Sequence, residues 1–241
     1  MIWLTALLVN SVLIAFAQRI PLLTPAGWFH AGILGTVLWG AIGWQAWSAV
    51  VIYLGLGSLV TKLGWKVKQQ RGLEEGRGGR RGPENVWGSA AVGAGLALLI
   101  GAGFQPAELF MLGFAASFAA KLADTFGSEI GQRWGRNTFL ITTLQAAPAG
   151  TEGAISLEGT LASAVGSGVM AMVMWGFDLI STTSELWLVS AVGLIATLAE
   201  SLLGALAQDR MNWLSNEVVN GIQTLFAALL AMALASIVHL V

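Results

Sequence analysis

The chain has 241 residues, of which 56% are hydrophobic and only 10% are charged, and its formal net charge is −1. This composition, with a mean hydropathy of +0.73, is typical of polytopic membrane proteins rather than globular ones. The near-neutral charge excludes a generally basic nucleic-acid binder, so we expect the lipid bilayer and no nucleic acid as a partner. Cysteine is absent and histidine occurs twice. Disulfides and thiolate metal sites are therefore excluded, and any metal should be a hard cation held by oxygen ligands.

Eight apolar stretches meet or approach the length of about 20 residues that a membrane-spanning helix needs. They predict an all-α polytopic membrane protein in which residues 1–241 form one transmembrane catalytic domain. The predicted spans are 1–17, 28–44, 47–63, 86–103, 107–123, 160–180, 186–207 and 217–240. The first span lacks the basic segment and cleavage site of a signal peptide, so we expect it to be retained. Residues 28–63 could alternatively form one long tilted helix.

Positive charge provides an independent prediction of topology, because Lys and Arg concentrate in cytoplasmic loops. All 12 of them fall on one side of the membrane if residues 28–63 form a hairpin. The charges therefore favour eight spans with both termini outside. They place the loops after the first, third, fifth and seventh spans in the cytoplasm.

The loop over residues 64–84 is rich in Gly and Arg and has no apolar periodicity, which predicts a flexible segment in the absence of ligand. One interpretation is that its charges serve only to set the topology. The alternative is that Arg77, Arg80 and Arg81 close over a phosphorylated substrate, since guanidinium groups suit phosphate.

Carboxylates, hydroxyls, a lysine and glycines gather between the fifth and sixth spans. If the fifth span continues as a helix, one face presents Lys121, Asp124 and Ser128. A second, adjacent row presents Thr125 and Glu129. This set suits magnesium-dependent phosphoryl transfer, which needs carboxylates for the metal and cations and hydroxyls for phosphate oxygens. The competing interpretation is a Lys121–Asp124 ion pair at the membrane interface with Glu129 solvated, although charges near membrane depth more often mark function.

The segment after Asn137 predicts a short cytoplasmic strand and turn between the fifth and sixth spans. A β-branched run over 139–144 is followed by Pro148 and Gly150, and the chain is expected to return as a hairpin through 154–157. The motif GTEGAISLEGT then presents amides and hydroxyls before a helix, which favours anion binding, although Ser and Thr also simply cap helices. Its candidate substrate-binding residues are Thr151, Glu152, Gly153, Ser156, Gly159 and Thr160.

Four further polar residues are expected to line the same pocket. Glu200 lies inside the seventh span, where a carboxylate requires a partner or a polar cavity. Asn216 and Asn220 open the eighth span on one side of the helix, and Asn216 is also a plausible N-cap. Asn85 begins the fourth span, where contact with a phosphate or ribose and helix capping explain it equally well.

The blocks GPENVWGSA, KLADTFGSEIG, GTEGAISLEGT, ESLLGA and NEVVN resemble a family of integral membrane proteins first described as a domain of unknown function. The characterised plant chloroplast member of that family is a phytyl-phosphate kinase. The resemblance covers almost the whole chain, and its DTxxSEIG and GTxGAxSxxGT blocks are the most specific. The family is distantly similar to the polyprenol kinases and the CDP-diacylglycerol synthases, which are membrane enzymes that use CTP and a metal-binding carboxylate site.

The resemblance implies phosphoryl transfer from a nucleoside triphosphate, with CTP favoured, to an isoprenyl monophosphate such as phytyl phosphate. The product would be a diphosphate for tocopherol or phylloquinone synthesis, and Mg²⁺ would be the cofactor. Carried over to this chain, it makes Lys121, Asp124 and Glu129 catalytic, with Asp124 and Glu129 as metal ligands. The choice of these carboxylates follows from chemistry, since the family pattern does not settle which carboxylate holds the metal. On chemical grounds we add Glu200 as a third candidate ligand. The residues left for substrate binding are Arg80, Arg81, Asn85, Thr125, Ser128, Asn216, Asn220, Glu200 and the six of the GTEGAISLEGT motif.

Two other functions use a similar set of residues. A cytidylyltransferase would transfer CMP to a lipid phosphate, and only the resemblance separates it from a kinase. A small transporter could also place Asp124 and Glu200 in a cavity, but no internal repeat is visible and the polar residues gather at one membrane face. We expect a multi-pass protein of the plasma membrane or an internal photosynthetic membrane, with its active site on the cytoplasmic side. A homodimer is compatible with the sequence.

Overall fold

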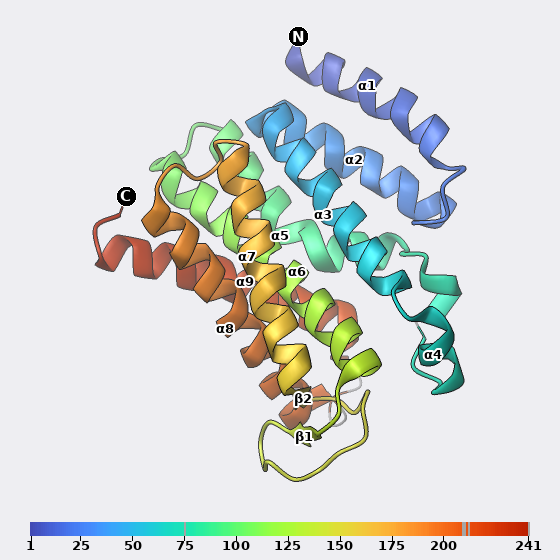
Figure 1. The fold of residues 1–241 in the computed structure, drawn as a ribbon. Coiled ribbons are helices and arrows are strands. Elements are labelled where there is room, and N and C mark those ends of the chain that lie inside the picture. Colours follow the sequence, from blue (N-terminus) through green and yellow to red (C-terminus); the bar gives the residue numbers. More distant parts are fainter. Residues whose placement is uncertain (75, 209–210, 212, 241) are drawn as a thin grey trace.

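The computed structural model describes residues 1–74, 76–208, 211 and 213–240. These residues form a bundle of long helices with a small two-stranded sheet at one end (Figure 1). The long helices are α1 (Ile2–Ala17), α2 (Pro25–Ile42), α3 (Trp44–Lys62), α5 (Pro83–Gly101), α6 (Ala107–Trp134), α7 (Leu157–Gly176), α8 (Thr183–Ala207) and α9 (Asn216–Ile237). Between α3 and α5 lie the short helix α4 (Trp65–Gln70) and the 3-10 turn η1 (Gly76–Gly79). Between α6 and α7 lie the strands β1 (Thr138–Leu140) and β2 (Ala154–Ser156).

Each predicted span coincides with one of these long helices, but the number of membrane crossings is confirmed only in part. Five helices in the described part of the chain, α3, α6, α7, α8 and α9, are long and apolar enough to cross a membrane. Helix α1 is apolar but has 16 residues, and α2 and α5 do not meet the same measure of length and composition. The described residues are therefore mostly helical and include five apolar spans, and eight crossings stay a prediction.

The uncertainty over residues 28–63 is resolved in favour of two helices. Gly43 separates α2 from α3 and has a φ of 94°, in the region that glycine adopts without the steric cost of a Cβ atom. The two helices run antiparallel beside each other (Figure 1). One continuous helix over this stretch is excluded.

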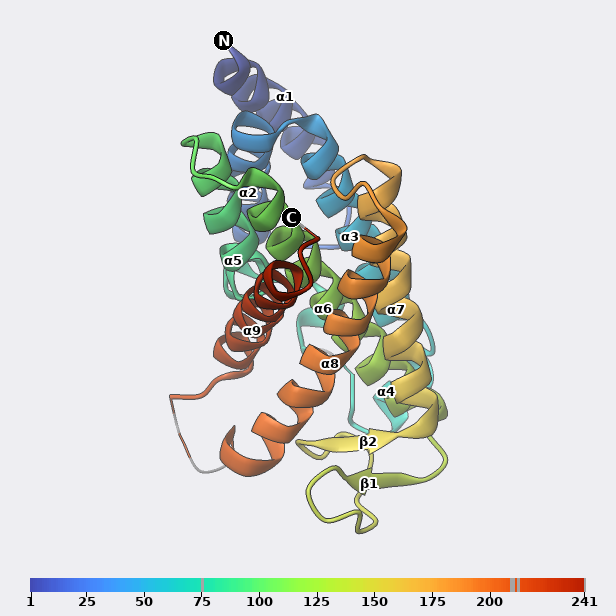
Figure 2. The same ribbon diagram turned by 90° about the vertical axis from the view of Figure 1, so that its left-hand side faces the viewer.

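Helix α6 lies at the centre of the bundle and packs against α3, α5, α7, α8 and α9 (Figure 2). Every residue from 112 to 123 is buried, as expected for a helix that is apolar around its whole circumference. Many of these residues are Ala, and such small side chains allow neighbouring helices to approach closely. The helix does not end at the predicted residue 123 but continues to Trp134. It thereby carries Lys121, Asp124 and Glu129 on one continuous element.

The two loops at the lower end of the bundle in Figure 1 are both structured. Strand β1 pairs antiparallel with β2, with Phe139 opposite Ile155, which confirms the predicted hairpin. The first strand is shorter than expected because the chain turns after Leu140, and Leu144 has a φ of 56°. The loop over 64–84, which was predicted to be flexible without ligand, contains the short helix α4, and Lys68 of this helix is completely buried.

Candidate active site

A cavity of about 450 Å³ lies at the end of the bundle that carries the hairpin. Its walls come from η1, from the first turns of α5, α7 and α9, from the C-terminal parts of α6 and α8, and from the hairpin. All the candidate residues of the sequence analysis line it: Arg77, Arg80, Arg81, Asn85, Lys121, Asp124, Thr125, Ser128, Glu129, Thr151, Glu152, Gly153, Ser156, Gly159, Thr160, Glu200, Asn216 and Asn220. The structure thus brings them together in one cavity, while their individual chemical roles stay predictions.

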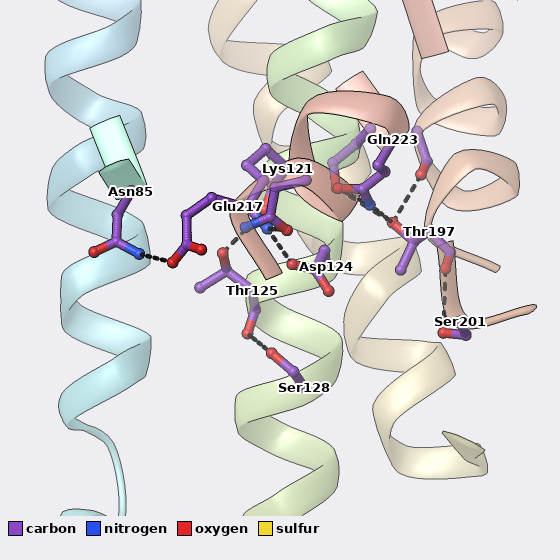
Figure 3. Close-up of polar contacts among 12 residues, drawn as sticks. Asn85, Lys121, Asp124, Thr125, Ser128, Thr197, Ser201, Glu217 and Gln223 are labelled. Carbon is purple, nitrogen blue, oxygen red and sulfur yellow. Dashed lines mark hydrogen bonds and ion pairs between the residues drawn. The ribbon is translucent and has the colours of Figure 1, made fainter. Parts of the chain in front are cut away.

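Lys121 is the cation at the inner wall of this cavity, and only 7% of its side chain is exposed. Its ammonium pairs with Asp124, one turn later on α6, and donates to Asn220 Oδ1 on α9 at 2.7 Å (Figure 3). A buried charge requires such compensation. The Lys121–Asp124 ion pair anticipated as the competing interpretation is therefore present. It lies in the cavity wall, where Asp124 keeps 19% of its side chain exposed.

A second carboxylate faces this ion pair. Glu200 of α8 interacts electrostatically with Asp124, Lys121 and Glu152, and all four residues line the cavity. The carboxyl groups of Asp124, Glu152 and Glu200 thus lie in the same cavity as the Lys121 ammonium group. Carboxyl oxygens gathered in this way are the ligands that a hard divalent cation prefers.

The donor set suits Mg²⁺ that arrives together with a substrate. Among the described residues no group of three or more His, Cys, Asp or Glu side chains is placed to hold a metal ion by itself. Proteins usually bind Mg²⁺ through one or two carboxylates, and waters and substrate phosphates complete its coordination shell. Asp124 and Glu200 provide oxygen ligands of that number and kind.

Glu129 has a different environment from the other two proposed metal ligands. It is not solvated, because its side chain is 5% exposed and forms an ion pair with the completely buried Lys68 of α4. The Lys68 ammonium also donates to the Thr61 carbonyl oxygen at 2.6 Å. Ligation of a metal by Glu129 would compete with this ion pair. The burial of Lys68 could not be predicted from the sequence, because the polar loop around it has no pattern that indicates burial.

The three arginines of the cavity differ in their partners. Arg77 forms an ion pair with Glu84 and donates to Asn85 Oδ1 at 3.1 Å. A backbone hydrogen bond and, secondarily, Arg77 lower the pKa of Glu84, which precedes the predicted span 86–103. The ion pairs among the described residues include neither Arg80 nor Arg81. These two guanidinium groups are therefore the cations of the cavity that have no carboxylate partner in the described structure.

Asn85 connects two helices and also bonds to the N-cap residue of one of them. Its Oδ1 accepts a hydrogen bond from the Gly82 amide at 2.9 Å, and its Nδ2 donates to Glu217 Oε1 on α9 at 3.3 Å (Figure 3). The N-cap of α5 is Gly82, so the expected N-cap role of Asn85 is wrong; Asn85 lies three residues later and accepts from the N-cap amide. Contact of Asn85 with a phosphate or ribose stays a prediction. The N-cap of α9 is Ser215 rather than Asn216.

The hairpin packs against α7 and α8 at their ends (Figure 2), and its residues form part of the cavity wall. Ser156 caps α7, because its Oγ accepts a hydrogen bond from the Gly159 amide at 3.1 Å. Gly153 has a φ of 73° and lies so close to α8 that a Cβ atom there would be 2.3 Å from the Ala205 Cβ. This close approach places Thr151 and Glu152 on the wall of the cavity.

A layer of uncharged polar side chains beneath Lys121 was missed from the sequence. Thr197 of α8 donates to the Ala120 carbonyl oxygen at 3.2 Å, and Gln223 of α9 donates to Thr197 Oγ1 at 3.2 Å (Figure 3). These bonds tie α6, α8 and α9 together. Single hydroxyls and amides inside apolar helices carry little sequence signal, because they commonly bond to their own helix backbone. Thr197 also lines the cavity, as do Ser89, Ser163 and Ser201.

Comparison with known proteins identifies the family of this chain. Residues 8–228 match the family described as integral membrane protein DUF92. The chain belongs to this family. The matched region contains all the candidate site residues, and the family together with the apolar helices establishes a multi-pass integral membrane protein.

Relatives of this DUF92 protein occur in bacteria, plants and archaea. An uncharacterized membrane protein of Synechocystis sp. is 47% identical over 242 residues, covering 99% of this chain and 93% of that protein. Protein VTE6, chloroplastic, of Arabidopsis thaliana is 40% identical over 234 residues, covering 92% of this chain and 69% of that protein. An uncharacterized membrane protein of Methanocaldococcus jannaschii is 30% identical over 227 residues, covering 94% and 92%. No solved structure matches the chain with significance.

Proposed function

We propose that this DUF92 protein is a kinase that uses CTP or another nucleoside triphosphate to phosphorylate an isoprenyl monophosphate, such as phytyl phosphate, to the diphosphate. The observation that carries the proposal is the cavity itself. It holds carboxylates, a lysine and two arginines without carboxylate partners in the described structure, at the end of a bundle of apolar helices. A substrate with an anionic head and an apolar tail requires both environments side by side.

The family supports the choice of substrate. The plant chloroplast member of the family that the chain resembles is a phytyl-phosphate kinase, and the Arabidopsis relative at 40% identity is chloroplastic. A role in tocopherol- or phylloquinone-type synthesis follows if this protein uses the same acceptor. The apolar tail would lie against the membrane helices, and the nucleotide would enter from the cytoplasm.

In the proposed reaction an oxygen of the acceptor phosphate attacks the γ-phosphorus of the nucleoside triphosphate. The bond from that phosphorus to the β–γ bridging oxygen breaks, and the nucleoside diphosphate leaves with the oxygen. The attacking group is already an anion, so it needs no strong general base. Catalysis then rests on positioning the two substrates and on neutralising their phosphate charges.

Different residues of the cavity would position the substrates and neutralise their phosphate charges. Arg80 and Arg81 would bind phosphate oxygens through their guanidinium groups. Lys121 has three N–H donors, and two of them contact Asp124 and Asn220, which leaves one for the transferred phosphoryl group. Asp124 and Glu200 would hold Mg²⁺, which when bound neutralises charge on the phosphate oxygens.

The test is a product analysis with purified protein in detergent. The protein receives Mg²⁺, each of the four nucleoside triphosphates in turn, and either phytol or phytyl monophosphate, and the products are separated by mass. We expect phytyl diphosphate and a nucleoside diphosphate from the monophosphate, and no product from phytol. A CDP-linked lipid together with released pyrophosphate would replace the kinase with a cytidylyltransferase. No turnover with any donor, while the protein remains folded, would overturn the proposal.

A further inference from the structure

Arg81 differs from the other arginines of the cavity in how firmly the fold holds its backbone. Its amide donates to the Leu22 carbonyl oxygen at 3.1 Å, and its carbonyl oxygen accepts from the Thr24 amide at 3.0 Å. The segment between α1 and α2 thus pairs with Arg81 as one rung of a parallel bridge. Arg77 and Arg80 are exposed. Arg81 is the half-buried member of the three.

The side chain of Arg81 is held as well, by two residues of α3. Its Cζ lies 5.9 Å from the centroid of the Tyr53 ring, within the range of a cation–π interaction. Its guanidinium crosses α3 at Gly57, where an added Cβ atom would be 2.9 Å from Nη2 and 3.3 Å from Nη1. Tyr53 is itself buried and packs edge-on against Phe118 of α6, with the ring centroids 5.5 Å apart.

We propose that Tyr53 and Gly57 are positioning residues that hold Arg81 ready to bind the phosphate of a substrate. This inference rests on the proposed function. Arg81 lines the cavity, whereas Tyr53 and Gly57 do not border it but contact Arg81. Tyr53 also interacts electrostatically with Lys121, and double variants that carry Arg81→Ala separate the two effects. An arginine fixed before binding loses less side-chain freedom when it captures a phosphate, and its affinity for that phosphate is correspondingly higher. The phosphate belongs either to the nucleotide or to the isoprenyl acceptor.

Gly57→Ala is the first test, and α3 provides a matched control. The new methyl group would displace the guanidinium at little cost to folding, because the contacted atoms are the far end of a flexible side chain and Ala favours a helix over Gly. Gly55 lies in the same helix with nothing within 4 Å of an added Cβ atom. Gly55→Ala should therefore leave every kinetic constant unchanged.

Tyr53 offers a second matched pair of variants. Tyr53→Leu removes the aromatic ring beneath Arg81, and loss of the cation–π interaction is worth roughly a twofold to thirtyfold change in binding. Tyr53→Phe keeps the ring. It removes a hydroxyl that is buried without a hydrogen-bond partner in the described structure, so we expect Tyr53→Phe to bind substrate as the wild type does.

The readout is KM for each substrate, measured separately from kcat, together with the double variants that carry Arg81→Ala. We expect Gly57→Ala and Tyr53→Leu to raise KM for one substrate, and the affected substrate identifies whose phosphate Arg81 binds. In the Arg81→Ala background, neither change should have a further effect. A purely structural defect would lower the active fraction without this selective change in KM.

The two proposals fail in distinguishable ways. If the wild-type protein makes diphosphate while Gly57→Ala and Tyr53→Leu leave both KM values unchanged, the positioning role is overturned and the kinase remains. Effects that persist undiminished in the Arg81→Ala background would also overturn it. A wild-type protein that binds neither nucleotide nor isoprenyl phosphate, measured by calorimetry, would overturn the proposed function.

Discussion

Lys68 is completely buried and forms an ion pair with Glu129, a residue 61 positions further along the chain. The pair joins α4 to the end of α6, and the Thr61 carbonyl oxygen adds the last turn of α3. It therefore anchors the segment that carries Arg77, Arg80 and Arg81 next to the cavity. Because both charges are buried, removing either side chain leaves the other charge without its ion-pair partner, which strongly destabilises the fold.

Glu129→Leu should destabilise the protein, because it removes the carboxylate that neutralises the buried Lys68 ammonium. Breaking a buried ion pair from one side costs about 3–5 kcal/mol. Thermal unfolding of the detergent-solubilised protein measures the loss. The double variant Lys68→Met with Glu129→Leu should recover most of the stability, since it removes both charges.

An exposed ion pair near the same loop provides the control. Arg77 and Glu84 keep 48% and 43% of their side chains exposed, and such pairs contribute about 0–1 kcal/mol. Glu84→Gln should therefore change the unfolding temperature little. Equal losses from Glu84→Gln and Glu129→Leu would contradict the anchoring role of the buried pair.

The sequence was enough to predict where the long helices lie and which candidate residues line the cavity, but the physical reasons differ. Long apolar stretches determine where helices lie in a membrane protein, because the bilayer requires about 20 apolar residues for each span. Ionisable residues such as Asp124 and Glu200 stand out because charge inside such stretches is costly and needs a functional or structural reason. The first rule located the eight long helices, and the second marked carboxylates such as Asp124 and Glu200. The other candidates that line the cavity came from helix-start patterns, as for Asn85, or from the Gly-rich loop and the GTEGAISLEGT motif.

The remaining features depend on contacts that local patterns do not encode. The burial of Lys68 is set by a partner far away in the sequence. The extension of α6 to Trp134 follows from packing against α7, where glycines of both helices meet. The polar bonds of Thr197 and Gln223 exist only because three helices meet at that depth.

Asp124→Asn should abolish most of the turnover and leave the fold intact. The amide oxygen still accepts from Lys121, and Glu200 remains beside the ammonium, so we expect the variant to fold with a lower unfolding temperature than the wild type. The substitution removes one of the proposed Mg²⁺ ligands, and loss of such electrostatic stabilisation lowers kcat by roughly 100- to 1000-fold. Glu158→Gln is the control, because Glu158 lies in the first turn of α7 and does not line the cavity. A folded Asp124→Asn variant with full activity would remove Asp124 from the site.

Gly153→Ala should displace the hairpin from α8. The added Cβ atom would be 2.3 Å from the Ala205 Cβ and 2.7 Å from the Ser201 carbonyl oxygen. The backbone also adopts a φ of 73°, which alanine tolerates poorly. We expect faster hydrogen exchange over residues 138–156 and a lower kcat. Gly168→Ala, where nothing lies within 4 Å of the added atom, should match the wild type. Unchanged exchange in Gly153→Ala would show that the hairpin does not need this close contact.

The membrane topology can be tested directly because the chain has no cysteine. Gln69 on α4 and Ser184 at the start of α8 are both exposed, so single cysteines there should react with a membrane-impermeant maleimide. The predicted eight spans put three crossings between the two positions and therefore place them on opposite sides. We expect Gln69→Cys to be labelled only after the cytoplasmic face is opened, and Ser184→Cys to be labelled in intact cells. Helix α5 decides the outcome, because its 19 residues are long enough for a span but are not apolar enough to count as one. If α5 does not cross, only two crossings remain and both cysteines will be labelled from the same side.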